Sequence, residues 1–147
     1  MAQTASVPPI VTQTFKFVLR SPLHGLVDKN ILLITFTGRK SGKTFTTPVS
    51  YSQHGAEVYI FTHANWWKNL RRDTPVTLRL RGRDVKGLPE PVAEDKQAVA
   101  AGLAEHLRVV PSDATFYGVT FDERRNPNAE QVARAVQSVV MIRVRPC

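Results

Sequence analysis

The sequence predicts an α+β fold in which an antiparallel or mixed sheet, curled into a barrel, carries peripheral helices. Strand-like runs follow one another between short turns in the first half of the chain, and residues 94–109 have helical periodicity. A last strand-like run occupies residues 138–144. With 147 residues and 42% hydrophobic composition, the chain has the size of one domain. We expect a mobile tail over residues 1–8 and a single domain over 9–147.

The first helix is expected over residues 9–19, where most apolar side chains can be placed on one side. We favour a helix packed over a sheet, and a helix lying on a membrane surface is the alternative. Ser21-Pro22 ends this helix, because the residue before a proline disfavours helical geometry. Residues 31–37 are almost continuously apolar and rich in strand formers, which indicates a central strand buried on both faces.

A meander should follow this strand. Residues 44–51 alternate loosely, and Pro48 lies at an edge, a bulge or a gap in pairing, because proline donates no ladder hydrogen bond. The turn His54-Gly55 leads into a strand over residues 56–62. Asn65 can cap a short helix whose adjacent tryptophans diverge by about 100 degrees, so one can enter the core while the other lines a groove.

The second half of the chain should contain one strand, two helices and a last strand. Residues 76–83 alternate most clearly, with an arginine on every second position and Gly82 as a bend. The segment 86–92, rich in proline and glycine, receives no assignment. A helix over 94–109, a short helix introduced by Asn126-Pro127-Asn128 and reaching about residue 137, and a strand over 138–144 complete the chain.

The charge distribution indicates an anionic partner. The net charge is +8, and residues 38–86 hold ten cations against three anions, so this segment alone is +7. Nucleic acid, acidic lipid and a polyanionic small molecule are all compatible with such a surface. Cys147 is the only cysteine, which excludes a disulfide framework, and no signal peptide or membrane span is recognisable. We expect a cytoplasmic protein, with contact at the inner face of the membrane as an open alternative.

The basic turn, defined as Gly38–Lys43, connects the first two strands. Its glycines allow a tight reversal, and we expect its backbone N–H groups and cationic side chains to face outward, as suits a phosphate or carboxylate. A solvated hairpin tip is the alternative. The rest of the chain offers no histidine pair with metal-ligand spacing, no nucleophile elbow and no paired carboxylates in the basic half, so we expect no metal site. This combination favours chemistry carried by a bound cofactor.

Three motifs in combination carry a resemblance to a known family: Leu32–Lys43 with Thr47-Pro48, Trp67–Leu70, and Pro75–Thr77. Together they resemble the deazaflavin-dependent nitroreductase family of the flavin/deazaflavin oxidoreductase superfamily. The resemblance spans roughly residues 20–86. It implies a split β-barrel and hydride transfer from an 8-hydroxy-5-deazaflavin coenzyme, with FMN or FAD less favoured.

The resemblance also implies site residues. The coenzyme tail would meet the basic turn, and the ring would lie beside one strand, with a tryptophan and an asparagine closing the site. The cofactor-binding residues are then Arg39, Lys40, Ser41, Gly42, Lys43, Pro48, Val49, Trp67 and Asn69. The acceptor would be a small conjugated molecule such as a quinone, an enone or a nitroaromatic. Ser50, Tyr51 and Tyr117 are the candidate catalytic residues that orient it, with Trp66 beside them. The proton would come from a tyrosine hydroxyl or from water.

Two other functions stay open. A lipid or hydrophobic-ligand binding protein, with fatty-acid or peripheral membrane contact, would use the helix over residues 9–19 with the basic face. A nucleic-acid-binding barrel would use the arginine row and the tryptophans, although no nucleic-acid motif is recognisable, so nucleic acid is the less favoured partner. Split barrels of the superfamily also suggest a homodimer.

Overall fold

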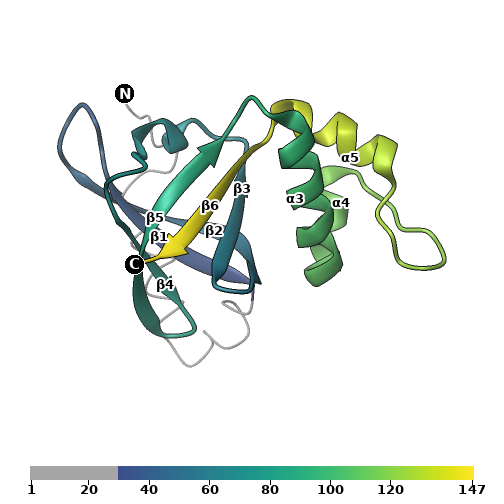
Figure 1. Ribbon diagram of the computed structural model, residues 1–147, viewed down its shortest axis with the longest axis horizontal. Coiled ribbons are helices and arrows are strands. Elements are labelled where there is room, and N and C mark those ends of the chain that lie inside the picture. The colour runs from purple at the N-terminus through teal and green to yellow at the C-terminus, as the bar shows by residue number, and fades with distance from the viewer. Residues whose placement is uncertain (1–29) are drawn as a thin grey trace.

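The described part of the protein is a six-stranded barrel with the α-helices α3, α4 and α5 gathered on one side (Figure 1). The structure is a computed structural model and describes residues 30–147. The strands are β1 (Ile31–Thr37), β2 (Thr44–His54), β3 (Glu57–Thr62), β4 (Val76–Leu80), β5 (Arg83–Val92) and β6 (Val140–Pro146). The α-helices are α3 (Lys96–Val109), α4 (Ala114–Tyr117) and α5 (Ala129–Ala135). Three short 3-10 helices are η1 (Trp66–Asn69), η2 (Pro111–Asp113) and η3 (Val136–Ser138).

The barrel closes in the order β1-β2-β3-β6-β5-β4, and every neighbouring pair is antiparallel. The expected α+β fold with a barrel and peripheral helices is therefore confirmed, and of the two sheet types left open the antiparallel one is present. The expected tail over 1–8 and the helix over 9–19 lie outside the described residues. The single domain over 9–147 stays a prediction. Within residues 30–147 no helix has the length and apolarity that a membrane span requires.

The expected single strand over 76–83 is wrong, because the chain reverses inside it. Arg81 and Gly82 both have positive φ, 52° and 77°, and Leu80 pairs with Arg83. Two such residues form a two-residue hairpin turn, so the glycine makes a reversal rather than a bend. Across the hairpin, Arg79 Nη1 lies 3.2 Å from Asp84 Oδ1, which makes this part of the arginine row a solvated face.

β5 begins at the end of the expected strand over 76–83 and continues through the segment 86–92 that received no assignment. It pairs with β4 only up to Gly87 and with β6 from Gly87 to Val92. Pro89 and Pro91 therefore lie where β5 has one neighbour, and a missing N–H donor is tolerated at such positions.

β2 changes partners halfway along its length. Residues 44–50 pair with β1, and residues 51–54 pair with β3. The β3 side of residues 44–50 is left without a strand partner, and Pro48 lies in this open stretch. The expectation that Pro48 marks an edge or a gap in pairing is confirmed.

Two hydrophobic clusters hold the fold together. One fills the barrel interior and includes Leu32, Ile34, Ile60 and Ile142, each fully buried. The other lies between the barrel wall and the helices, and includes Leu103 and Leu107 of α3 with Met141 of β6. Trp66 is buried in the barrel cluster while Trp67 packs half-buried against it. One tryptophan therefore enters the core, as predicted.

The helix boundaries follow the capping signals in the sequence. Asp95 caps α3 by accepting a hydrogen bond from the Ala98 amide at 3.1 Å, and Pro111 follows the helix end. Asn128 caps α5 by accepting from the Gln131 amide at 2.9 Å. The helices expected over 94–109 and after Asn128 are therefore present.

Gly87 provides a test of the barrel packing. A Cβ atom at this position would lie 2.5 Å from Val144 Cγ1 and 2.9 Å from the Arg145 carbonyl oxygen of β6. Because the backbone of a paired strand cannot move away easily, Gly87→Ala should lower the free energy of unfolding by about 1–3 kcal/mol. Urea denaturation measures this, with Lys86→Ala at the neighbouring exposed position as the control. Equal denaturation midpoints for the two variants would contradict the packing described.

Candidate functional site

The basic turn is a tight hairpin tip held by its own backbone. The Gly38 amide donates to the Lys43 carbonyl at 2.7 Å, and the Gly42 amide donates to the Gly38 carbonyl at 2.9 Å. Gly42 has a φ of 72°, which favours glycine. Gly38 is buried, and a Cβ there would lie 2.7 Å from Phe45 Cε2. Both glycines are therefore required by the shape of the turn.

The expectation that the amides of the turn face outward is wrong at four of its six positions. Besides Gly38 and Gly42, the Lys43 amide donates to Ser41 Oγ at 3.1 Å and the Arg39 amide to Asn69 Oδ1 at 2.9 Å. A hairpin this tight uses its N–H groups to close itself. What it presents outward is mainly the exposed cationic side chains of Arg39, Lys40 and Lys43.

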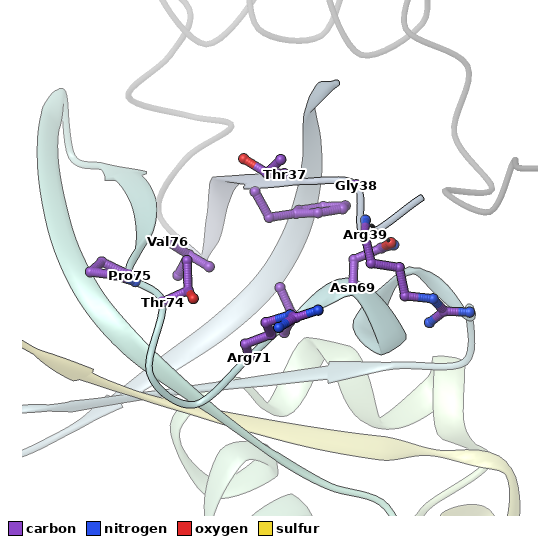
Figure 2. Close-up of a pocket in the computed structure, with 10 residues that line it drawn as sticks. Thr37, Gly38, Arg39, Asn69, Arg71, Thr74, Pro75 and Val76 are labelled. Atoms are coloured by element: carbon purple, nitrogen blue, oxygen red, sulfur yellow. Dashed lines mark hydrogen bonds between the residues drawn. The ribbon is translucent and has the colours of Figure 1, made fainter. Parts of the chain in front are cut away.

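A pocket of about 310 Å³ opens beside the turn, and we call it the arginine pocket. Figure 2 shows Arg39 and Asn69 on one side of it, Thr74, Pro75 and Val76 on the other, and Arg71 between them. Phe36, Thr37, Gly38 and Leu70 complete the lining. Two exposed arginines and a threonine hydroxyl around one hollow make a surface suited to phosphate or carboxylate groups.

Asn69 connects the basic turn to η1. Its Oδ1 accepts from the Arg39 amide, and its Nδ2 donates to the Trp66 carbonyl at 2.9 Å. Trp66 in turn stacks on Phe36 with ring centroids 5.3 Å apart. Asn69 and Phe36 line the arginine pocket, while Trp66 lines a second pocket, so η1 borders both.

The second pocket, which we call the aromatic pocket, has a volume of about 470 Å³ and lies along the open stretch of β2. Its lining comes from β2, the end of β3 with the following loop, η1, η2 and α4: Thr47, Pro48, Val49, Ser50, Phe61, Thr62, His63, Ala64, Trp66, Asp113, Phe116 and Tyr117. Pro48, Val49 and Ser50 are therefore brought together with Tyr117. Backbone without a strand partner and aromatic side chains can accommodate a flat, conjugated molecule.

An aromatic cluster forms one wall of this pocket. The His63 ring lies 5.6 Å from Phe116 and 5.8 Å from Tyr117, and the rings of Phe116 and Tyr117 meet edge to face at 5.1 Å. Phe116 is 72% exposed, which is unusual for a large apolar side chain. The cluster gives an aromatic ligand a face against which to stack.

A chain of hydrogen bonds leads away from the aromatic pocket between β2 and α3. Ser50 Oγ donates to Asp113 Oδ2 at 2.5 Å, and Asp113 Oδ2 also lies 2.8 Å from His106 Nε2. His106 Nδ1 lies 2.8 Å from Ser52 Oγ, which lies 2.8 Å from His54 Nε2. His106 is fully buried. The three β2 members alternate along the strand, because every second side chain of a strand points to the same face.

The environment shifts three pKa values in this region. Burial raises the pKa of Asp113, but hydrogen bonds from His106 and Ser50 and the charge of His106 outweigh burial and hold it below its usual 3.8. Burial, followed by the negative charge of Asp113, raises the pKa of Tyr117 far above its usual range. Burial lowers the pKa of His54 below 6.5, with Glu105 opposing and His106 reinforcing this shift.

The remaining predicted residues are distributed as follows. Arg39 and Asn69 share the arginine pocket, while Lys40, Ser41, Gly42 and Lys43 form the exposed tip of the turn. Trp67 packs against the barrel core and does not belong to the lining of either pocket described here.

Tyr51 is not brought together with Ser50 and Tyr117. It is 3% exposed in the barrel interior, and its hydroxyl has no hydrogen-bond partner among residues 30–147. Its neighbours on β2 point to the other face of the strand.

Sequence reasoning missed Asp113 and His106 as site residues. They lie 63 and 54 positions from their serine partners on β2, so no local motif marks them. The only signal was a histidine on the apolar face of the helix over 94–109, which is also typical of a core histidine. No cluster of three metal-ligating side chains occurs in the described part of the chain.

Comparison with known proteins adds a family match. A family model described as F420H(2)-dependent quinone reductase matches residues 20–117, well over half of the chain. No curated protein matches the chain.

Solved structures of similar shape share little sequence with this chain. A conserved hypothetical protein from Mycobacterium tuberculosis has 20% identity and a TM-score of 0.55, over 86% of this chain and 80% of that one. A candidate 5-nitroimidazole antibiotic resistance protein from Bacteroides thetaiotaomicron has 12% identity and a TM-score of 0.56, over 84% and 77%. An FAD-binding protein from Mesorhizobium loti has 16% identity and a TM-score of 0.51, over 86% and 90%. These likenesses support the fold alone, which is the expected split β-barrel.

Asn69→Ala tests the connection between the basic turn and η1. The variant removes the acceptor of the Arg39 amide and the donor to the Trp66 carbonyl. Hydrogen exchange of the Arg39 amide should accelerate, and the free energy of unfolding should fall by about 1 kcal/mol. The amide of Lys43, whose acceptor is Ser41, serves as the internal control. Unchanged exchange at Arg39 would rule out this role for Asn69.

Asp113→Asn tests the acid stability of the chain of hydrogen bonds. The pKa of Asp113 is lowered in the folded state, so its contribution to stability is present above the unfolded pKa of about 3.9 and is lost as the pH falls through the folded pKa. Thermal melting between about pH 5 and pH 2 should therefore show a steeper loss of stability in the wild type than in the variant. Glu123→Gln, at an exposed position, is the control and should follow the wild type. Parallel curves for wild type and Asp113→Asn would contradict the shift.

Proposed function

The chain belongs to the F420H(2)-dependent quinone reductase family, and from this membership we propose that it reduces a small conjugated acceptor, a quinone first of all, at the aromatic pocket. The family establishes an oxidoreductase that uses the 8-hydroxy-5-deazaflavin coenzyme. The acceptor and the residue roles are our proposal. The observation that carries it is the aromatic pocket along the open stretch of β2, bordered by the same η1 that borders the arginine pocket.

The arginine pocket suits the phosphate-bearing, carboxylate-rich tail of the coenzyme. Arg39 and Arg71 offer planar guanidinium groups, and Lys40 adds an exposed ammonium beside them. Because four amides of the basic turn are used within the protein, we assign the recognition of the tail mainly to side-chain charge. The affinity for the coenzyme should therefore depend strongly on salt.

The open stretch of β2 suits the ring of the coenzyme. Pro48 and Val49 offer an apolar surface, and the backbone of this stretch has no strand partner on the side of β3. When bound, the reduced deazaflavin supplies a hydride, and the contribution of the protein is to hold the acceptor in position and to exclude water.

The aromatic cluster and two hydroxyl groups suit the acceptor. Phe116 and His63 provide ring faces for stacking, and the hydroxyls of Ser50 and Tyr117 belong to the same pocket lining. The raised pKa of Tyr117 keeps its hydroxyl protonated, so it donates a hydrogen bond to an acceptor oxygen. We assign orientation to Tyr117 and the proton-donating contact to Ser50, because the Ser50 hydroxyl is hydrogen-bonded to Asp113 and so to the groups behind it.

The overall reaction fixes what the protein must supply. Reduction of a quinone to a hydroquinone requires one hydride and one proton. The reduced coenzyme supplies the hydride, which carries two electrons, and is oxidised. The protein supplies the proton. A homodimer, and contact with a fatty acid or a membrane, stay predictions.

Charge reversal in the arginine pocket tests this proposal. Arg39→Glu and Arg71→Glu should each weaken binding of the deazaflavin coenzyme at least about tenfold, because each replaces an attraction to the anionic tail by a repulsion. Quenching of the coenzyme fluorescence by added protein measures the affinity. Arg83→Glu makes the same change in net charge at the exposed β4–β5 hairpin and should bind nearly as the wild type does.

Three results bear on this proposal. If all three variants lose affinity equally, the general positive field rather than the arginine pocket holds the tail, and our assignment is wrong. Wild-type protein should also oxidise the reduced coenzyme when menadione, a quinone, is added. Absence of that oxidation would refute the proposed acceptor class.

A further inference from the structure

We propose that Asp113, His106, Ser52 and His54 form a proton relay that carries protons from solvent to Ser50 in the aromatic pocket. This inference rests on the proposed function, because it assigns the source of the one proton that quinone reduction requires. Ser50 would be the catalytic member, since it gives its proton to the acceptor. The other four act through it and through one another.

The geometry is continuous from the pocket to the edge of the β2–β3 hairpin. The four links measure 2.5 Å between Ser50 and Asp113, 2.8 Å between Asp113 and His106, 2.8 Å between His106 and Ser52, and 2.8 Å between Ser52 and His54. Every link is within hydrogen-bond distance of oxygen or nitrogen. His54 lies one residue before the Gly55 turn and is partly exposed, so the far end of the chain reaches solvent.

With a neutral His106, the donors and acceptors fit a relay that runs from His54 toward Asp113. The ionised carboxylate of Asp113 can only accept, so Ser50 Oγ and His106 Nε2 both donate to it. In a neutral imidazole the other nitrogen, Nδ1 of His106, then accepts from the Ser52 hydroxyl. The Ser52 oxygen in turn accepts from His54 Nε2. From His54 to Asp113 each group donates to the next, which is the arrangement that proton hopping requires, and Ser50 donates to Asp113 from the other side.

The position of the relay explains why an internal route is needed. Coenzyme and acceptor together would fill the aromatic pocket and keep bulk water away from the reacting atoms. Asp113 has 26% of its side chain exposed and belongs to the lining of that pocket, so bound ligands would cover it. His106 is fully buried behind it. His54, at the solvent end of the relay, lies on the hairpin end of β2, away from the open stretch, and is not part of the pocket lining.

One turn of the relay balances as follows. Ser50 first turns its hydroxyl from Asp113 to the acceptor oxygen, which takes the proton, and Ser50 then takes a proton that reaches Asp113 Oδ2 from His106 Nε2. His106 Nδ1 then takes the hydroxyl proton of Ser52, and Ser52 takes the Nε2 proton of His54. His54 Nδ1 finally takes a proton from solvent. One proton enters at His54, one leaves at Ser50, and the relay keeps its net charge.

The surroundings of His54 favour this entry role. Tyr59 of β3 lies against its ring with centroids 4.3 Å apart, and Glu105 and His106 of α3 are the charged and titratable groups that act on it. Because its pKa lies below 6.5, His54 is mainly neutral at pH 7 and has a free nitrogen for a solvent proton. Glu105 is exposed, and its negative charge opposes the lowering of the His54 pKa.

Two variants and a control test the relay in the working enzyme. With reduced deazaflavin coenzyme and menadione in dilute buffer, His54→Ala and Ser52→Ala should each slow turnover about tenfold or more and increase the solvent deuterium isotope effect. Added imidazole should restore the turnover rate of His54→Ala, because the site of His54 is open to solvent. It should not restore the turnover rate of Ser52→Ala, because Ser52 is buried. Gln53→Ala changes the exposed residue between them and should behave as the wild type.

A coenzyme-free measurement separates the relay from the reaction. In nitrogen NMR spectra of the protein alone, Ser52→Ala should shift the signals of His54 and His106 together, because it removes the hydroxyl between them, while Gln53→Ala leaves both in place. Coenzyme affinity, measured by fluorescence quenching, should be unchanged in all three variants. These readouts distinguish a broken relay from a damaged pocket.

The outcomes separate the two proposals. If the wild type does not oxidise the reduced coenzyme with menadione, the proposed function fails and the relay fails with it. If the wild type is active but His54→Ala and Ser52→Ala match Gln53→Ala in rate and isotope effect, the relay alone is overturned. If the NMR signals of His54 and His106 do not shift in Ser52→Ala, the proposed connection of the two histidines through Ser52 is wrong. Slower turnover with rescue by imidazole only in His54→Ala would establish it.

Discussion

The change of partner halfway along β2 is the constraint on which the rest of the structure depends. Because residues 44–50 pair only with β1, a stretch of backbone stays open on the side of β3, and the aromatic pocket lies against it. The two-residue period of the same strand separates its side chains. Val49 and Tyr51 contribute to the barrel core, whereas Ser50, Ser52 and His54 face η2 and α3. One strand therefore supplies a wall of the pocket and the hydrogen-bond chain behind it.

Local patterns were enough to predict most of the fold. The strands β1 to β3 show in runs of strand-forming residues separated by turn residues, and the helix after Asp95 and the cap at Asn128 depend on contacts within a few residues. The β4–β5 hairpin was missed because Arg81 occupies a position with positive φ that arginine rarely adopts. β5 was not predicted because it contains two prolines. Prolines fit in this strand because they lie where it pairs with β6 alone.

The site was predictable in its charge and less so in its connections. The cations of the basic turn and the position of Pro48 beside a gap in pairing follow from the sequence, and Asn69 was expected from the family resemblance. The Arg39 amide bonds to Asn69, 30 positions away, and the links from β2 to Asp113 and His106 join residues 63 and 54 positions apart, so no local motif displays them. Tyr51 illustrates the same limit, because the face of the strand that enters the barrel depends on which neighbours β2 pairs with.

The continuity of β2 has an evolutionary consequence. Because its eleven residues serve the pocket at one end and the hydrogen-bond chain at the other, inserting or deleting one residue within it would exchange the two faces of everything beyond that point. Tyr51 and Gln53 would then stand where Ser52 and His54 now stand. Divergence within this strand is therefore restricted to substitutions. The loop that carries His63 and the short α4 that carries Phe116 are free to change in length, so diversity in ligand choice should accumulate there while the strand behind them keeps its length.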